Sequence, residues 1–483
     1  MVLAFISDLP AYASVLLIIC LIAVCLFEAI NGFHDTANAV ATVIYTKTLT
    51  PNVAVVWSGI MNFLGVFFGG MVMASILSVF GGSGGDGGIA VAMGIVKLMP
   101  LNEMMASEMN ATIALVLAVL LSAIIWNLGT WYYGIPCSSS HTLIGALLGA
   151  GFAFSTIYKD AKVNWSKAGE IGSSLLISPL FGFSLAILLM FLLRSFVKNK
   201  AIFKEPDTKK PPPFWIRLVL ILTCTLVSFF HGSNDGQKGV GLLLVVMMAF
   251  MPLQFAFNPS LDQQALKSYA LKMEAQLTSA ANAAGPDGHA DVLNGFAGQA
   301  GRVATQLDTL DRSNKTEILA VRKSVQELNK GLKGAMEGNL IQDKETRKVV
   351  KAEIKKLSES YEFAPIWLIV LISICLGVGT MIGWKRIVVT IGEKIGKSHL
   401  TYAQGASAEL CAAATIGVST GLGLPVSTTH VLSSGIAGTM VAQGGVQNLQ
   451  RKTILNIALA WLLTLPVSFL LAGGLFYILR AIL

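Results

Sequence analysis

Long apolar runs separated by short polar breaks occupy most of the chain. A helix of about 18 or more apolar residues is long enough to cross the roughly 30 Å hydrocarbon core of a bilayer. The runs lie near residues 11–30, 52–80, 111–133, 140–157, 170–193, 214–230, 239–257, 364–384, 403–420, 428–443 and 453–479. We therefore predict an all-α membrane protein, a polytopic helical bundle of about 10–12 transmembrane segments. The first run has neither a basic residue before it nor a convincing cleavage site, so we expect a retained span.

Two stretches interrupt the apolar pattern. Residues 194–213 carry six basic residues and end in three prolines, which predicts a basic linker on the cytoplasmic side. Residues 258–363 mix both charges and space apolar residues three and four apart, as at Val321, Val325 and Leu328. This spacing predicts a soluble insert of amphipathic helices that pack on themselves or on a partner.

Two motifs occur twice along the chain. GFHDTANAV begins at Gly32 and matches GSNDGQKGV from Gly232 at an offset of 200 residues. GIPCSSSHT begins at Gly134 and matches GLPVSTTHV from Gly423 at an offset of 289. The offsets differ by 89 residues, close to the length of the charged insert, which therefore interrupts the second copy between its motifs.

The duplication divides the membrane part into two halves. Residues 1–193 form the first half, and residues 214–257 with 364–483 form the second. If Asp35 and Asp235 lie in broken spans, each half makes about five crossings, an odd number that inverts the second half. With the N-terminus outside, the short cytoplasmic loops hold most of the basic residues, and the insert lies in the periplasm.

Composition agrees with lipid as the main solvent. Hydrophobic residues make up 54% of the chain and charged residues 13%, with a mean hydropathy of +0.67. The net charge of +8 comes from short loops beside apolar spans, so it indicates membrane orientation and no nucleic-acid partner. The six cysteines show no CxxC spacing, so they predict neither a metal site nor a disulfide framework.

The first motif pair places ionisable side chains inside lipid-spanning runs, where they are costly and mark an ion or substrate pathway. Neighbouring glycines would let these spans unwind and expose carbonyl oxygens to a small cation. The candidate cation-coupling residues are Glu28, His34, Asp35, Asn38, Asn234, Asp235 and Lys238. The alternative is a polar helix-packing patch, although such patches use Ser, Thr or Asn more often than repeated Asp.

The second motif pair has the chemistry of an anion site. Pro136 and Pro425 each precede a run of hydroxyl residues, which is typical of a capped helix start. Two helix N-termini related by the repeat would bind one tetrahedral oxyanion from opposite sides. The candidate ligands are Ser139, Ser140, Thr142, Ser427, Thr428 and Thr429. Capping without a ligand is the alternative, and His141 and His430, which follow, are either packing or functional residues.

With these motifs the chain resembles the inorganic phosphate transporter (PiT) family, in particular the low-affinity phosphate permeases of enteric-type bacteria. The resemblance covers both halves and omits mainly the insert. Its specific signature is the duplicated G-x-N-D-x-x-N-x element, reinforced by P-x-S-x-[ST]-H. It implies inverted repeats, a phosphate site at the membrane midplane, coupling cations at Asp35 and Asp235, and a homodimer in the lipid of the bacterial inner membrane. The phosphate ligands that it implies are Ser139, Ser140, Thr142, Thr428 and Thr429.

The chain departs from the family pattern at residues that bear on the coupling ion. His34 and Lys238 stand where the family motifs usually have Asn, and Glu28 lies on nearly the same helical face as Asp35. Titrating groups suit a proton better than sodium, so we hypothesise proton symport, with sodium as the alternative. The related permeases resemble carriers of a metal–phosphate complex, so Asp35 and Asp235 are also tentative ligands for Mg²⁺ or another divalent metal, without a resident cofactor.

Three other functions remain open at this stage. The same scaffold would suit sulfate or another tetrahedral oxyanion. A membrane-embedded hydrolase would need His and carboxylate ligands that converge on a metal, and a passive channel would conduct without accumulation. Broken, duplicated, charged spans favour alternating access over an open pore. We therefore expect a transporter, and we expect no enzyme. Three further polar residues in apolar runs are expected to be packing or supporting groups: Asn62, Asn127 and Glu409.

Overall fold

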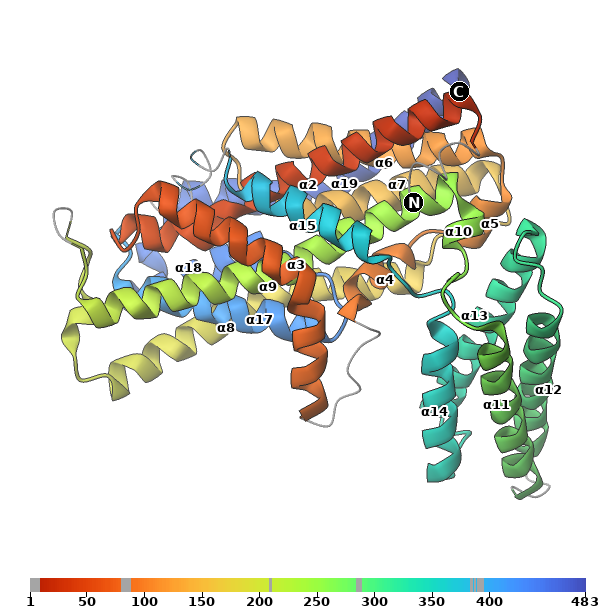
Figure 1. Cartoon of the computed structure of the whole chain (residues 1–483). Coiled ribbons are helices and arrows are strands. Elements are labelled where there is room, and N and C mark those ends of the chain that lie inside the picture. The colour runs from red at the N-terminus through yellow and green to blue at the C-terminus, as the bar shows by residue number, and fades with distance from the viewer. Residues whose placement is uncertain are drawn as a thin grey trace. The chain divides into compact units, whose positions relative to one another are not determined.

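A computed structural model describes residues 9–79, 88–207, 211–283, 289–382, 385, 388 and 395–483, and its described secondary structure is helical (Figure 1). Among these residues, seven helices are long and apolar enough to cross a bilayer. They are α2 (Ala11–Tyr45), α3 (Pro51–Val79), α6 (Met109–Tyr132), α7 (Ser139–Ile157), α8 (Trp165–Phe196), α9 (Phe214–Phe250) and α19 (Arg451–Ile482). The predicted all-α membrane bundle is thus confirmed. Other α-helices outside residues 263–358 are α4 (Ala90–Val96), α5 (Leu101–Ala106), α10 (Pro252–Phe255), α15 (Ile366–Thr380), α17 (Tyr402–Gly421) and α18 (Thr428–Gly444).

The chain divides into two compact units. The first consists of Met1–Leu101, Asn110–Val246 and Ala364–Leu483, and it contains the apolar helices. The second consists of Asn102–Met109 and Met247–Phe363. This second unit is called the soluble unit here, after the predicted soluble insert that it contains. It begins near the end of α9, before the expected boundary at residue 258, and it includes a short segment from the first half of the sequence.

The helices that carry the first motif pair are continuous, so the prediction that these spans are broken is wrong. α2 is helical through Asp35 over 35 residues, and α9 is helical through Asp235 over 37 residues. The runs near 214–230 and 239–257 are therefore parts of one helix. The physical reason is that the glycines serve close packing: a Cβ at Gly232 would meet the backbone of Asn62 on α3, and one at Gly236 would meet Val66.

The repeat-related helices α2 and α9 run antiparallel, as the colouring of Figure 1 also shows. Glu409 accepts hydrogen bonds from Thr42 near the end of α2 and from Thr223 near the start of α9. Nearer the start of α2, Glu28 lies against Gly239, which is nearer the end of α9. An inverted repeat requires this opposite direction for the pair.

Broken helices do occur, but at the second motif pair. α6 and α7 form one hairpin (hairpin 1, residues 109–157), and α17 and α18 form another (hairpin 2, residues 402–444). The chain reverses between the arms at Gly134 and Gly423, where φ is +65° and +70° and a residue with a Cβ would be strained. These two glycines are repeat partners, so both halves reverse the chain at equivalent positions through a glycine with positive φ.

The two arms of each hairpin end on the same side. In hairpin 1, Asn110 at the start of α6 donates to the Leu483 carbonyl after α19, and Thr156 near the end of α7 shares a hydrogen bond with Tyr477 of α19. The runs near 111–133 and 140–157 are therefore two arms with a tip between them. In hairpin 2, Gln404 near the start of α17 likewise donates to a backbone carbonyl near the end of α18.

The hairpins enter from opposite ends of α2. Tyr12 near the start of α2 donates to Asn110 at the open end of hairpin 1, at 3.2 Å. Thr42 near the end of α2 packs against Gly405 at the open end of hairpin 2. The two tips therefore meet near the middle of α2, at the level of Asp35.

Repeat partners also make equivalent packing contacts. A Cβ at Gly149 of α7 would meet the backbone of Phe469 on α19, and one at Gly438 of α18 would meet the backbone of Phe183 on α8. Each hairpin thus packs closely on the long helix that follows the other hairpin in sequence. Helices from both halves of the sequence therefore hold each hairpin in place.

The soluble unit is built on four helices: α11 (Gln263–Ala283), α12 (His289–Asp308), α13 (Lys315–Glu337) and α14 (Lys344–Ser358). Val321, Val325 and Leu328, whose spacing predicted an amphipathic helix, are all buried in this unit. Charged side chains are buried in the same unit as well, among them Arg322 and Glu353. The unit therefore has a small apolar core that also encloses polar groups.

The Arg322 guanidinium is held by polar partners inside the soluble unit. It donates to the Ala256 carbonyl at 2.5 Å and to Asn102 Oδ1 at 3.1 Å. Burial lowers the pKa of this group to about 10. Arg322 therefore ties the segment from the first half of the sequence to the insert.

We expect Arg322→Met to lower the free energy of unfolding of the soluble unit by about 1–3 kcal/mol, because it leaves a buried carbonyl without its donor. Hydrogen exchange of the α13 amides in the full-length protein measures this loss. Lys323→Met is the matched control, since Lys323 is the exposed neighbour on the same helix. Equal amide protection in the two variants would contradict the assigned role.

Candidate functional site

Each hairpin tip starts a helix with a serine cap. Ser138 is the N-cap of α7 and accepts from the His141 backbone N–H at 3.2 Å, and Ser427 does the same for His430 in α18. This confirms the predicted capped helix starts. The first N–H groups of a helix have no partner inside that helix, so both tips present donors and a positive dipole end to the site.

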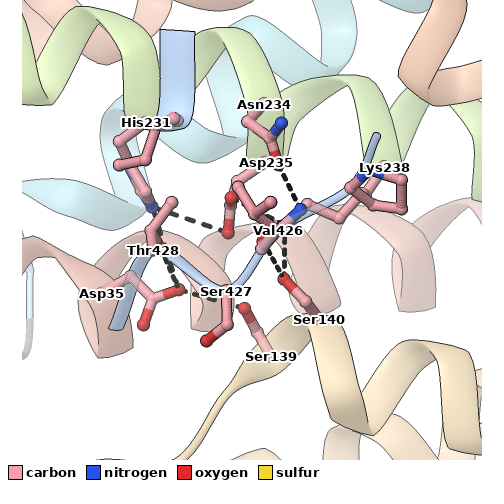
Figure 2. Close-up of polar contacts among 12 residues, drawn as sticks. Asp35, Ser139, Ser140, His231, Asn234, Asp235, Lys238, Val426, Ser427 and Thr428 are labelled. Atoms are coloured by element: carbon pink, nitrogen blue, oxygen red, sulfur yellow. Dashed lines mark hydrogen bonds and ion pairs between the residues drawn. The ribbon is translucent and has the colours of Figure 1, made fainter. Parts of the chain in front are cut away.

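The Asp35 carboxylate of α2 lies where the donors of the two tips converge (Figure 2). Oδ2 accepts from Ser139 Oγ of hairpin 1 at 3.0 Å and from Thr428 Oγ1 of hairpin 2 at 3.5 Å. Oδ1 accepts from Thr429 Oγ1 at 2.5 Å. A negative group thus already occupies the place at which two helix starts favour an anion.

Lys238 joins the Asp235 carboxylate to both tips. Its ammonium donates to Asp235 Oδ1 at 2.7 Å and to the Val426 carbonyl at 2.9 Å, and it also donates to Ser140 Oγ. Ser140 in turn donates to the Val426 carbonyl at 2.9 Å. All three ammonium donors are used, which is what a buried lysine requires.

His231 lies between the two carboxylates. Its Nε2 is 3.8 Å from Asp35 Oδ2 and 3.7 Å from Asp235 Oδ2, and the ligand atoms of the three residues all lie within 4.8 Å of one another. Within the described part of the chain, neither His231 Nε2 nor Asp235 Oδ2 has a hydrogen-bond partner. Two oxygens and one nitrogen at this spacing fit around a single cation. His231 is not among the predicted cation-coupling residues, although it belongs to the same polar cluster and its i, i+4 relation to Asp235 on one helical face is a usable signal.

His34 and Glu28 approach this centre from α2. His34 Nδ1 is 3.6 Å from Asp35 Oδ1, and its Nε2 is 3.4 Å from the hydroxyl of Thr130 on α6. Glu28 accepts from Asn31 at 3.4 Å and lies beside α9. The structure thus brings His34 next to Asp35, and it puts Glu28 further along the α2–α9 interface.

Asn234 lies at the tip of hairpin 2. Its amide nitrogen donates to Thr420 Oγ1 at 3.0 Å and to the Leu424 carbonyl at 3.2 Å, and its Oδ1 accepts from the Val426 N–H at 3.2 Å. In this conformation both ends of the amide hold the bend of the hairpin to α9. A role for Asn234 in cation coupling stays a prediction.

Two other predicted residues are not placed in the centre. The Thr142 hydroxyl donates to the Ser138 carbonyl at 3.0 Å, one turn back in its own helix. The side chain of Asn38 lies outside the described residues. His141 and His430 contact each other across the two tips, with ring centroids 4.5 Å apart, which is consistent with a packing role.

Buried ionisable groups of two antiparallel helices, closed by two hairpin tips, define the chain as a multi-pass membrane transporter. Residues 31–472 match the phosphate transporter family, and the chain belongs to this family. It is 39% identical to the low-affinity inorganic phosphate transporter PitA of Escherichia coli (strain K12), with 98% of each chain covered. It is 38% identical to PitB of the same organism, over 97% of this chain and 98% of PitB. It is 28% identical to a probable low-affinity inorganic phosphate transporter of Bacillus subtilis (strain 168), over 98% of this chain and 99% of that protein.

The fold is also similar to a solved structure, the sodium-dependent phosphate transporter. The two share 20% identity and a TM-score of 0.53, over 97% of this chain and 100% of the other. This likeness supports the fold of the membrane unit. Since the family and the relatives are transporters, the prediction that the protein is not an enzyme is confirmed.

Proposed function

We propose that this chain imports inorganic phosphate across the bacterial inner membrane by symport with a cation, and that the cation is a proton. The family and the names of the relatives support phosphate as the substrate. The chemistry of the tips agrees with it, because hydroxyls and helix N-termini suit a tetrahedral oxyanion. The homodimer that the resemblance implies is part of this proposal, and light scattering in detergent tests it.

One observation carries the coupling argument: the hydroxyls that would bind phosphate donate to Asp35. Ser139 and Thr429, one from each tip, both use their hydrogen on this carboxylate. A phosphate ion needs the same donors and would lie a few ångströms from the carboxylate charge. Two unit charges 4 Å apart repel by about 4 kcal/mol at the effective dielectric of a partly buried site. Phosphate therefore binds well only after a cation neutralises Asp35.

Protonation is the simplest way to release these donors. A protonated carboxyl is a weaker acceptor than a carboxylate, so the hydroxyls become available as the charge disappears. His34 and His231 lie beside Asp35 and are titratable groups that suit proton transfer. The fixed ammonium of Lys238 already neutralises the second carboxylate. A sodium ion is the alternative coupling ion.

A divalent metal is a second candidate companion of the anion. The triad of Asp35, His231 and Asp235 offers two oxygens and one nitrogen with an unpartnered nitrogen among the described contacts. Phosphate bound at the tips would neutralise such an ion from the other side, so the pair would move as a neutral complex. Mg²⁺ would use the carboxylate oxygens alone, whereas a borderline metal would also use the imidazole.

Access would alternate by movement of one hairpin at a time. Because the hairpins enter from opposite ends of α2, withdrawal of one tip would open the site to one side while the other tip stays closed. This arrangement matches alternating access around a fixed midplane site. In this scheme one tip closes the site at any time, which disfavours a channel.

Uptake of radiolabelled phosphate into proteoliposomes tests the proposal when pH, sodium and magnesium gradients are imposed separately. We expect uphill accumulation with an acidic exterior and equal sodium on both sides. Accumulation that needs sodium and ignores the pH gradient would contradict proton coupling. Excess sulfate should leave uptake unchanged, and strong competition by sulfate would instead favour a general oxyanion carrier.

A further inference from the structure

We propose that Asn62 of α3, held by Thr380 of α15, is a positioning residue that fixes the tautomer of His231. The inference rests on the proposed function, in which Asp35, His231 and Asp235 hold the coupling cation. It assigns a role to a residue that the sequence treats only as a supporting polar group. The hydrogen bonds of three helices carry the argument.

The orientation of the Asn62 amide follows from Thr380. The Thr380 hydroxyl donates to the Leu376 carbonyl of its own helix at 2.8 Å, so it can only accept from Asn62. The group that faces it at 2.9 Å is therefore the Asn62 amide nitrogen. The carbonyl end of the same amide, Oδ1, then faces His231.

The tautomer of His231 follows from this amide. Asn62 Oδ1 lies 2.8 Å from His231 Nδ1, and a carbonyl oxygen can only accept, so Nδ1 carries the hydrogen. Nε2, the nitrogen that faces Asp35 and Asp235, then has a lone pair when the ring is neutral. The two helices pack closely at this point, because Gly232 brings the backbone of α9 against the backbone of Asn62.

This tautomer makes the site depend on a cation. A lone pair opposite two carboxylates is repelled unless a proton or a metal ion lies between them. In the other tautomer, an N–H at Nε2 would satisfy one carboxylate without any cation, and the demand for the coupling ion would weaken. Asn62 therefore disfavours the tautomer with its hydrogen on Nε2, which would stabilise the site without a bound cation.

Nitrogen-15 NMR of the imidazoles tests the tautomer directly in the full-length protein in lipid. The His231 signals are assigned by their loss in His231→Gln, and spectra are recorded at a pH at which the ring is neutral. We expect the hydrogen on Nδ1 in the wild type, on Nε2 in Asn62→Leu, and on Nδ1 again in Asn62→Asp, whose carboxylate is also an acceptor. A wild-type ring with its hydrogen on Nε2, or a tautomer unchanged by Asn62→Leu, would overturn the proposal.

Transport supplies the second readout. We expect Asn62→Leu to raise the coupling-cation concentration for half-maximal uptake about tenfold to a hundredfold, as for other groups that orient a ligand, with a smaller effect on the maximal rate. Asn62→Asp should recover most of the loss. Ser58→Ala is the matched control, because Ser58 makes a 2.9 Å hydrogen bond with Ser228 at the same α3–α9 interface one turn away. Its uptake should match the wild type.

If Asn62→Leu does not fold, Thr380→Val carries the same test, since it removes the hydroxyl that orients the amide and leaves Asn62 in place. A shift of the His231 hydrogen toward Nε2 would support the proposal, and an unchanged tautomer would overturn it. If the wild-type protein shows no cation-driven phosphate uptake, the proposed function is contradicted, whereas the tautomer found by NMR remains valid. The two failures are therefore distinguishable.

Discussion

Asp35→Asn is expected to abolish uphill phosphate uptake while the protein remains folded and inserted. Asparagine keeps the size of the side chain and one acceptor oxygen for the tip hydroxyls, but it has no charge for the cation to neutralise. Removing one partner of a buried charged pair costs about 3–5 kcal/mol. This corresponds to a loss of roughly two to four orders of magnitude in the apparent affinity for the cation.

Uptake into proteoliposomes at matched protein content measures this effect. Asp308→Asn is the matched control, because Asp308 makes an exposed ion pair with Lys267 in the soluble unit. It should transport like the wild type. Uphill accumulation in Asp35→Asn at the wild-type rate would show that this carboxylate does not couple the two fluxes.

Lys238→Asn is expected to abolish proton-driven uptake and to create a need for sodium. In the wild type the Lys238 ammonium supplies a fixed positive charge to Asp235 and holds both tips through Ser140 and Val426. Asparagine is what the first copy of the motif has at the equivalent position, Asn38. It removes the charge and offers a carbonyl oxygen, so a sodium ion can take the place of the ammonium beside Asp235.

Lys238→Met separates this explanation from simple damage. Methionine has a similar length but no oxygen for a hard cation, so sodium should not restore its uptake. The two variants are compared at several sodium concentrations without a pH gradient. Sodium-independent, pH-driven uptake by Lys238→Asn at the wild-type level would contradict the role of the ammonium.

The internal repeat predicted more of the site than any single motif did. The offset of 289 residues related Ser139 and Ser140 to Thr428 and Thr429, and the structure brings both pairs to one place. This was predictable because a repeat constrains geometry at long range. The capped helix starts were predictable because capping depends on a few adjacent residues.

The path of the helices was harder to predict. Glycines in the first motif pair suggested unwinding, but α2 and α9 are continuous, since Gly232 and Gly236 accommodate α3. Whether a glycine breaks a helix or lets two helices approach depends on a partner far away in sequence. For the same reason, hairpin arms and full crossings look alike as apolar runs.

The contacts among the polar partners of the site could not be predicted from the sequence. His231 and Asn62 are 169 residues apart, and their contact depends on how α3 packs on α9. Glu409 is predicted as a packing or supporting group, and its partners Thr42 and Thr223 come from different halves of the chain. Such contacts give no local pattern, because the partners come from distant parts of the chain.

A structure with arsenate, a heavier tetrahedral analogue of phosphate, tests the central claim most directly. Anomalous scattering from arsenic in a crystal of the full chain at acidic pH would locate the anion. The account predicts one peak between the two hairpin tips, within hydrogen-bond distance of Ser139 and Thr429, with Asp35 no longer bonded to both. An arsenate bound elsewhere, with these hydroxyls still donating to Asp35, would contradict it.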